Sequence, residues 1–465
     1  MSQSTLLRRI LHRPAATLSV LLALAAGLGL RLWMLRFYEV NGDSLIYGGL
    51  AKNLLLHGQY AITGSDGVLH STLIRLPGYP LFLAACFRLF GLENYAWVAY
   101  TQIALELAGC LLLADFARRI APVPLRAGAA HCTLWLAALC PFTAIYAAEP
   151  LTEALTLFMI ALALWSAARF GERPGWAPAL CFTFAITYAA LLRPDGALLG
   201  VALAPAMVFG LRRGKEMPGI EESPNVTRAV GAVVICPALQ RGVGATKNFP
   251  ESRRDGAYAP RTSNSAVRLI RMAVVCVLLA LAPFAAWSWR NWQLFHVFEP
   301  LAPRYANDPG QETYPGWQRW VKSWCLDYVS TYEVYWPVPG ERLDLTKLPS
   351  RAFDSPQQYA ETAALADDYN LRDQAKDIVP DVDARFGQLA DERIAAHPWR
   401  YYLWLPLGRV ADMALRPRVE NMDIDLDWWV YQHHHTETRF CWEYAGLNAL
   451  YLLLALAGLC LRPRF

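Results

Sequence analysis

The sequence predicts an all-α integral membrane protein: a multi-span helical bundle with interfacial helices and a mostly helical extracytoplasmic region. Of its 465 residues, 55% are hydrophobic and only 18% are charged, a balance too apolar for a soluble domain of this length. Long uncharged stretches recur along the chain, and basic residues flank many of them. A basic and aromatic array of the kind that binds nucleic acid is absent from the sequence, so we expect no nucleic-acid partner.

We expect about eight membrane spans, with nine or more as an alternative, and both termini in the cytoplasm. Arginines precede the first apolar run and follow the last one, which favours this orientation. The expected spans are 15–35, 95–117, 127–147, 150–168, 176–192, 196–211, 272–289 and 444–461. The segment 401–415 is apolar on one face but carries Arg409 and Asp412, so we expect an interfacial helix there, with a ninth span as the alternative.

The distribution of charge divides the chain into five regions. These are a membrane module (1–211), a linker (212–271), a single span (272–289), an outer region (290–440) and a last span (441–465). The linker holds eleven basic against five acidic residues, which predicts a disordered or loosely packed cytoplasmic segment. Within the outer region, 341–393 holds twelve acidic against seven basic residues, and this opposite sign supports the orientation.

The first outer loop, 37–94, is expected to carry the functional residues. Asn41-Gly42-Asp43 supplies the start of a short helix whose apolar pattern stops at His57-Gly58. The turn from Arg75 to Pro80 then leads into a second helix, 81–90. That helix is too short to cross a bilayer, so we expect it to lie in the membrane interface.

Charged residues at the ends of the expected helices fall on one face of the membrane: Asp43, Arg75, Glu149, Glu153, Arg193, Asp195 and Arg290. Glu149 and Glu153 are four residues apart, so we expect them on the same side of one helix. Guanidinium groups bind phosphate oxygens and a nearby carboxylate can take a proton from a hydroxyl, which suits chemistry at a lipid phosphate. Simpler roles stay open: a helix cap for Asp43, helix-dipole stabilisation for the glutamates, and interfacial anchoring for the arginines.

Two buried groups have structural interpretations beside functional ones. Glu106 lies near the middle of an expected span, where we expect a hydrogen bond between helices, with a functional role as the alternative. The ten cysteines are scattered and lack a CxxC pair. We expect buried thiols, with a disulfide between Cys325 and Cys441 as the alternative.

The run His433-His434-His435 followed by Glu437 has the composition of a Zn or Mn site. Consecutive side chains point in different directions, however, and the sequence offers no evident second set of ligands. We therefore expect no metal site here.

A series of short motifs occurs in a characteristic order: Asp43 with Tyr47, the stretch Ala51–Leu54 with Gly58, the stretch Arg75–Ala84, Glu149–Glu153, Arg193–Gly196 and Trp289–Asn291. In this order and on one side of the membrane, they resemble those of the multi-spanning GT-C glycosyltransferases. The similarity is to bacterial members related to the protein O-mannosyltransferases and the lipid A aminoarabinose transferase. It covers roughly the first 210 residues and the seventh expected span.

The resemblance implies an inverting glycosyltransferase of the bacterial inner membrane. It would transfer a hexosyl or pentosyl group from a polyprenyl-phosphate donor to a hydroxyl of a lipid, glycan or protein on the extracytoplasmic face. The implied catalytic residues are Asp43 with Glu149 or Glu153, those at the donor phosphate are Arg75, Arg193 and Arg290, and those at the substrate are Tyr47, Tyr79 and Asp195. No cofactor is required, although a divalent cation is compatible. Asp43-Ser44 stands where the protein mannosyltransferases have an Asp-Glu pair, which puts a protein acceptor in doubt.

Three other functions compete with this interpretation. A transporter or flippase for lipid-linked sugars predicts polar residues along a path through the membrane. A ligase or polymerase of the O-antigen type uses a pyrophosphate-linked oligosaccharide and typically has more spans and a shorter outer loop. A scaffold that anchors the outer region would keep its function without Asp43.

Overall fold

The computed structural model describes residues 14–40, 42–205, 262–372, 377–430 and 432–460. The chain divides into two compact units, which are considered separately. The first comprises Met1–Trp33, Val40–Cys140 and Tyr146–Ala302, and the second Met34–Glu39, Pro141–Ile145 and Pro303–Phe465.

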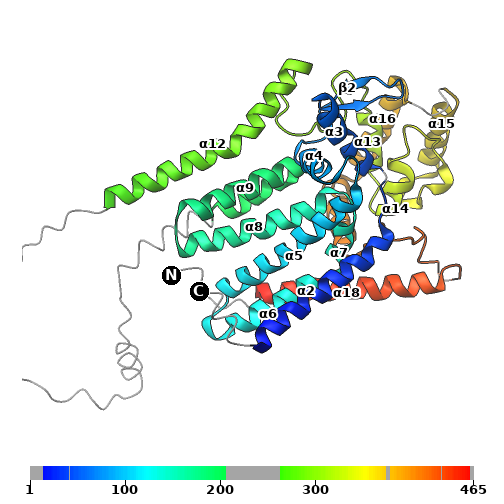
Figure 1. Cartoon of the computed structure of the whole chain (residues 1–465). Helices are drawn as coiled ribbons and strands as arrows, with labels where there is room; N and C mark the ends of the chain where they lie inside the picture. Colours follow the sequence, from blue (N-terminus) through cyan, green and yellow to red (C-terminus); the bar gives the residue numbers. More distant parts are fainter. Residues whose placement is uncertain (1–13, 41, 206–261, 373–376, 431, 461–465) are drawn as a thin grey trace, which may run out of the picture. The chain divides into compact units, whose positions relative to one another are not determined.

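The first unit is mainly a bundle of long helices (Figure 1). Its helices are α2 (Pro14–Met34), α3 (Asp43–His57), α4 (Gly78–Phe90), α5 (Tyr95–Ile120), α6 (Arg126–Ala138), α8 (Thr152–Glu172), α9 (Trp176–Leu192) and α12 (Thr262–Phe295), with α7 (Pro141–Ala148) divided between the units. Short helical turns of this unit are η2 (Val123–Leu125) and η3 (Pro194–Gly196), whereas η1 (Leu35–Phe37) belongs to the second unit. One antiparallel hairpin joins β1 (Ala61–Thr63) to β2 (Leu69–Ser71).

The second unit is also helical. Its helices are α13 (Pro315–Lys322), α14 (Tyr328–Ser330), α15 (Pro356–Arg372), α16 (Pro380–Ala396), α17 (Leu405–Leu415) and α18 (His435–Cys460). Shorter turns are η5 (Thr331–Tyr335), η6 (Leu345–Lys347), η7 (Ser350–Ala352) and η8 (Arg400–Trp404). Helices α13 and α16 pack together over a core that includes three tryptophans and a phenylalanine, Trp317, Trp320, Trp324 and Phe386.

Among the described residues, five helices are long and apolar enough to cross a membrane, or six if the bent pair α6 and α7 forms one span. The apolar window of α12 is only 6% buried within the protein and that of α18 only 11%, against 39% for α5 and α8. Large apolar side chains of α12 such as Ile270 and Leu278 are more than 60% exposed. Such outward-facing apolar surface is what a lipid environment covers, so the chain is best described as a membrane protein.

The expectation of eight spans is only partly met. Helix α9 has 17 residues, fewer than the roughly 20 that a membrane crossing needs. The third expected span is broken, because α6 and the helix after it meet at 51°. Residues 206–261 lie outside the described residues, and they include the end of the sixth expected span, 196–211, and most of the expected linker, 212–271.

Several helices extend beyond the expected spans that they contain. Helix α12 begins at Thr262, inside the expected linker, and continues to Phe295, so Arg290 lies within it. Helix α18 begins at His435, before the expected last span. The segment 401–415 forms η8 and the 11-residue α17, which is too short for the alternative of a ninth span.

The segment 37–94 contains the two expected short helices and a hairpin that was not predicted. Helix α3 ends as expected at Gly58, whose φ of +65° is readily adopted by glycine. Helix α4 begins at Gly78, earlier than expected, because the Pro77-Gly78 turn forms its first residues. A Cβ atom on Gly78 would lie 2.6 Å from the carbonyl carbon of Leu191. Only glycine therefore allows α4 to approach the end of α9 this closely.

Helices α5, α8 and α9 lie side by side, and α3 and α4 lie across one end of α8 and α9 (Figure 1). The contacts between these long helices are rich in alanine: Ala161, Ala163, Ala185 and Ala189 are at most 1% exposed. Small side chains let helix backbones approach closely, as in membrane-embedded bundles. The bundle thus gives α3 and α4 a firm base.

Candidate functional site

Tyr47 of α3 lies among the charged residues of the first unit. Its side chain is buried, and the Arg75 guanidinium lies 6.0 Å from the centre of its ring. Burial and then the negative charge of Asp43 raise the pKa of Tyr47 to about 12, while Glu153 and Arg193 also act on the phenol electrostatically. At neutral pH the hydroxyl therefore stays protonated and can donate a hydrogen bond.

The first ion pair of this site joins the start of α3 to the turn before α4. Arg75 Nη2 donates to Asp43 Oδ1 at 2.6 Å, and the two side chains are 23% and 49% exposed. The Tyr60 hydroxyl donates to the Arg75 carbonyl at 3.0 Å, which fixes the backbone of the turn. Arg75 Nε is buried and has no hydrogen-bond partner among the described residues. Asp43 is the first residue of α3, and Gly42 occupies the N-cap position before it. The Asp43 carboxylate accepts its hydrogen bond from Arg75.

The second set of charges lies where α8 begins and α9 ends. Arg193 Nη1 donates to Glu153 Oε1 at 2.8 Å, and its Nε donates to Asp195 Oδ1 at 3.2 Å. Because α8 and α9 are consecutive and pack antiparallel, the first turn of one meets the last turn of the other. All three side chains are at least 30% exposed, so solvent and ligands can reach them.

Hydrogen bonds tie the two sets of charges to the same framework. Ser44 Oγ donates to the Pro150 carbonyl at 3.2 Å, which joins the start of α3 to the segment before α8. Gln102 of α5 donates to the Glu149 carbonyl at 2.5 Å and accepts from the Tyr79 hydroxyl at 2.7 Å. Gln102 was missed as a structural residue, although a glutamine inside an apolar run is the kind of signal that could have found it.

Two predicted site residues have roles that differ from the expectation. Glu149 precedes α8 and has an extended backbone conformation. The prediction that Glu149 and Glu153 lie on the same side of one helix is therefore wrong. Tyr79 is 0% exposed and makes an edge contact with Tyr47 at 5.1 Å between ring centres. Tyr79 packs against the ring of Tyr47 and is too deeply buried to contact a substrate directly.

Arg290 also differs from its predicted position at the donor phosphate. Its guanidinium donates to the Thr72 carbonyl at 2.7 Å and to the Tyr60 carbonyl at 2.8 Å. It also lies over the ring of Trp287 at 4.9 Å. These contacts hold α12 against the base of the hairpin, so we assign Arg290 to that junction.

A buried ion pair joins α2 to α5. Arg31 of α2 donates to the Glu106 carboxylate of α5, and the two side chains are 0% and 6% exposed. Arg31 also donates to the carbonyls of Gly27 and Ala138, at 2.9 and 2.7 Å. The expectation that Glu106 bonds between helices is confirmed, but its partner was not predicted.

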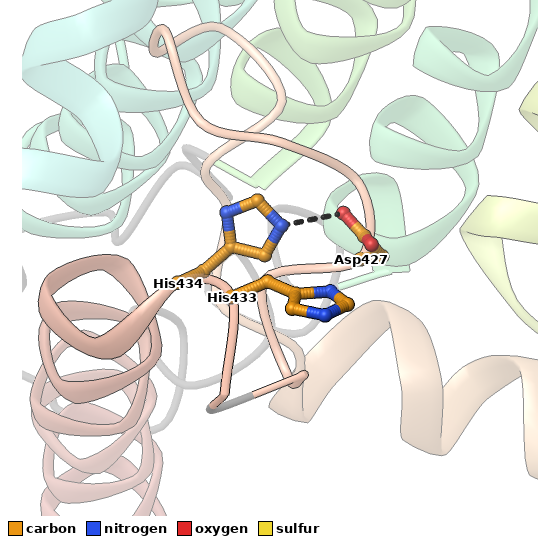
Figure 2. Close-up of side chains that lie close together, drawn as sticks. All are labelled: Asp427, His433 and His434. Carbon is orange, nitrogen blue, oxygen red and sulfur yellow. Dashed lines mark ion pairs between the residues drawn. The ribbon is translucent and has the colours of Figure 1, made fainter.

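In the second unit, the histidine run has the ligand partners that the sequence did not reveal. Asp427, His433 and His434 form one group with metal-binding potential (Figure 2), and Asp425, His434 and Glu437 form another. The aspartates come from the loop that leads back to α18. The alternative disulfide is not formed, because Cys325 and Cys441 are both free thiols in the structure.

An anionic ligand could bind the arginines around Tyr47 only by replacing the carboxylates with which they are now paired. Asp43, Glu153 and Asp195 supply three carboxylates, and Arg75 and Arg193 supply two guanidinium groups. Each arginine is paired with carboxylates, whose oxygens lie where the oxygens of a phosphate could also bind it. A phosphate that takes over an arginine would release a carboxylate to act as a base.

No family model matches this chain, and comparisons with curated proteins and with solved structures also found no match.

Proposed function

We propose that the chain is a membrane glycosyltransferase that moves a sugar from a polyprenyl-phosphate donor to a hydroxyl acceptor. The observation that carries this proposal is the grouping around Tyr47 of carboxylates and arginines from α3, the turn before α4, the start of α8 and the end of α9. Two guanidinium groups beside reachable carboxylates provide phosphate binding and proton acceptance together.

In this mechanism the donor phosphate takes Arg75 away from Asp43. The freed Asp43 carboxylate accepts the proton of the acceptor hydroxyl. At the same time the oxygen of that hydroxyl bonds to the anomeric carbon of the sugar. The bond from that carbon to the phosphate oxygen breaks on the opposite face, so the configuration inverts. Arg75 and Arg193 stabilise the departing polyprenyl phosphate, and the protonated Tyr47 hydroxyl can donate to it.

The main rival is a flippase or transporter for the same lipid. Its signature would be charged groups that line a path through the bundle. Arg31 and Glu106 are deeply buried charged residues in the described interior of the bundle. Arg31 donates hydrogen bonds to Glu106 and to two backbone carbonyls. This pair therefore gives the transport interpretation little support, although transport of a lipid-linked sugar is also an outcome of the experiment below.

The test uses the purified full-length chain in nanodiscs, with polyprenyl-phosphate mannose or polyprenyl-diphosphate oligosaccharide as donor and a cell-envelope extract as acceptor. Mass spectrometry would follow release of polyprenyl phosphate and the new glycosylated product. We expect turnover of the monophosphate donor, and a decrease of about 10²- to 10⁴-fold for Asp43→Asn, since a general base would be lost.

Asp66→Asn is the matched control, because Asp66 is an exposed acid of the same outer loop that bonds locally to Val68 and His70. It should keep wild-type turnover. Equal turnover in the Asp43 variant and the wild type would contradict the proposal. Turnover of the diphosphate donor alone would favour the ligase or polymerase class, and movement of the donor without bond cleavage would favour transport.

A further inference from the structure

The turn before α18 places carboxylates at both ring nitrogens of His434. His434 Nε2 lies 3.2 Å from Asp427 Oδ1 (Figure 2). On the other side of the ring, His434 Nδ1 lies 3.5 Å from Asp425 Oδ2 and 3.7 Å from Glu437 Oε2. One imidazole therefore bridges two acidic groups that belong to the second unit alone.

Charge argues for a cation at this place. Three carboxylates, from Asp425, Asp427 and Glu437, face a single His434 ring. With a neutral imidazole this group has a formal charge of −3, and a divalent ion bound to the ring reduces it to −1, a smaller residual charge than the −2 that a protonated imidazole would leave. A metal ion is therefore better suited to this group than a histidine ion pair alone.

The geometry also suits a metal ion. The ligand atoms of Asp427, His433 and His434 all lie within 4.8 Å of one another. Atoms bound to one zinc ion are about 3.5 Å apart, because zinc bonds to nitrogen and oxygen are about 2.0–2.2 Å long. Asp427 and His433 are exposed, so small side-chain rotations can close the difference.

We propose that Asp427, His433 and the Nε2 atom of His434 bind a divalent transition-metal ion of the Zn²⁺ type. Two imidazoles and one carboxylate are a ligand set that such ions favour. The single N–H at His434 Nδ1 is then directed towards the carboxylates of Asp425 and Glu437, and carboxylates commonly lie behind a metal-bound histidine in this way. Three protein ligands leave a position for water, and the exposure of the group makes the ion exchangeable.

The ion would fasten the loop to the first turn of α18. The Asp425 backbone N–H already donates to Glu437 Oε2 at 3.3 Å, and the Thr438 hydroxyl donates to the Trp428 carbonyl. The same loop supplies Asp425, Trp428 and Trp429 to the wall of a cavity of about 470 Å³. Binding of the ion should therefore order one wall of this cavity.

The test uses full-length protein that carries no polyhistidine tag, stripped with EDTA in detergent and titrated with ZnCl₂ by calorimetry. Titration with CoCl₂ would report the ligand set through its visible absorption. We expect one Zn²⁺ per chain, and at least a tenfold weaker affinity for His434→Ala and for His433→Ala. Glu437→Gln should weaken binding by about 10- to 100-fold, as loss of an orienting partner does elsewhere.

His435→Ala is the matched control, because His435 belongs to the same histidine run but to neither ligand group. It should keep the wild-type affinity and the Co²⁺ spectrum. The proposal is wrong if the wild type binds no stoichiometric Zn²⁺, or if the His435 variant loses as much affinity as the His434 variant. Tryptophan fluorescence of each variant would show that it is folded, and the exposed His433 gives a second variant should His434→Ala fail to fold.

Discussion

The first unit holds two kinds of arginine–carboxylate pair, one sealed inside the helix bundle and one open to ligands. Arg31 and Glu106 are almost fully buried, and backbone carbonyls take further donors of Arg31. Arg75 and Asp43, by contrast, are 23% and 49% exposed. A buried pair cannot change partners without leaving a charge unsatisfied, whereas an exposed pair can do so at little cost. Burial thus separates charges that hold the bundle together from charges that a ligand can reach.

The sealed pair should give the largest effect on stability. Arg31→Met leaves the Glu106 carboxylate buried without its partner, so we expect the free energy of unfolding to decrease by on the order of 3–5 kcal/mol. Denaturant titration in detergent micelles would measure it. A second substitution, Glu106→Leu, should restore most of the loss, because it removes the stranded charge. If Arg31→Met alone were as stable as the wild type, the buried pair would not be required for stability.

The close approach of α4 and α9 should give the next effect. Gly78→Ala pushes a methyl group against the Leu191 backbone, so we expect a loss of about 1–3 kcal/mol from overpacking. Thermal unfolding would measure it, and glycosyl transfer should fall as well, because Arg75 precedes this helix. Gly49→Ala in α3 is the control, since its added Cβ has open space. If the two variants behave alike, close packing under the site is not required.

Substitutions in the exposed ion pairs should affect activity more than stability. For Arg193→Lys we expect unfolding within about 1 kcal/mol of the wild type, because exposed ion pairs contribute little. The KM for the polyprenyl-phosphate donor should rise about tenfold, since an ammonium group cannot reproduce the guanidinium fork. Steady-state kinetics would measure it, with Arg88→Lys on the exposed side of α4 as control. Unchanged kinetics for Arg193→Lys would remove it from the donor site.

The smallest effect concerns pH. The folded-state pKa of Tyr47 is raised to about 12, so as pH rises above 10 the unfolded chain loses this proton first and stability falls. We expect the wild type to lose about 1 kcal/mol more than Tyr47→Phe between pH 8 and pH 10.5. Denaturation midpoints of both proteins at the two pH values would measure it. Equal losses would mean that the phenol is not held neutral by its surroundings.

The sequence predicted the helical class and the two short helices within 37–94, because these depend on local signals. The stop at Gly58 and the turn before α4 follow from glycine and proline geometry. It predicted spans less well, since hydropathy does not reveal the bend between α6 and α7 or the early start of α12. The compact core around Trp317 was also missed, because its tryptophans are scattered through a polar region.

The candidate site divides in the same way. The pairing of Arg193 with Glu153 follows from antiparallel packing of consecutive helices, and the sequence indicated both residues. It could not show that Tyr79 is buried or that Arg290 is engaged by carbonyl groups, because both facts depend on tertiary packing. The partners of His434 were missed for the same reason: they depend on how a loop folds back.

The Arg290 junction has a mechanical consequence. Its guanidinium donates hydrogen bonds to the backbone carbonyls that flank the hairpin, those of Tyr60 and Thr72. The Tyr60 hydroxyl in turn donates to the carbonyl of Arg75. A long apolar helix such as α12 changes its tilt with the thickness of the bilayer. The position of α12 and that of the peptide carrying Arg75 are therefore linked through the backbone at the base of the hairpin.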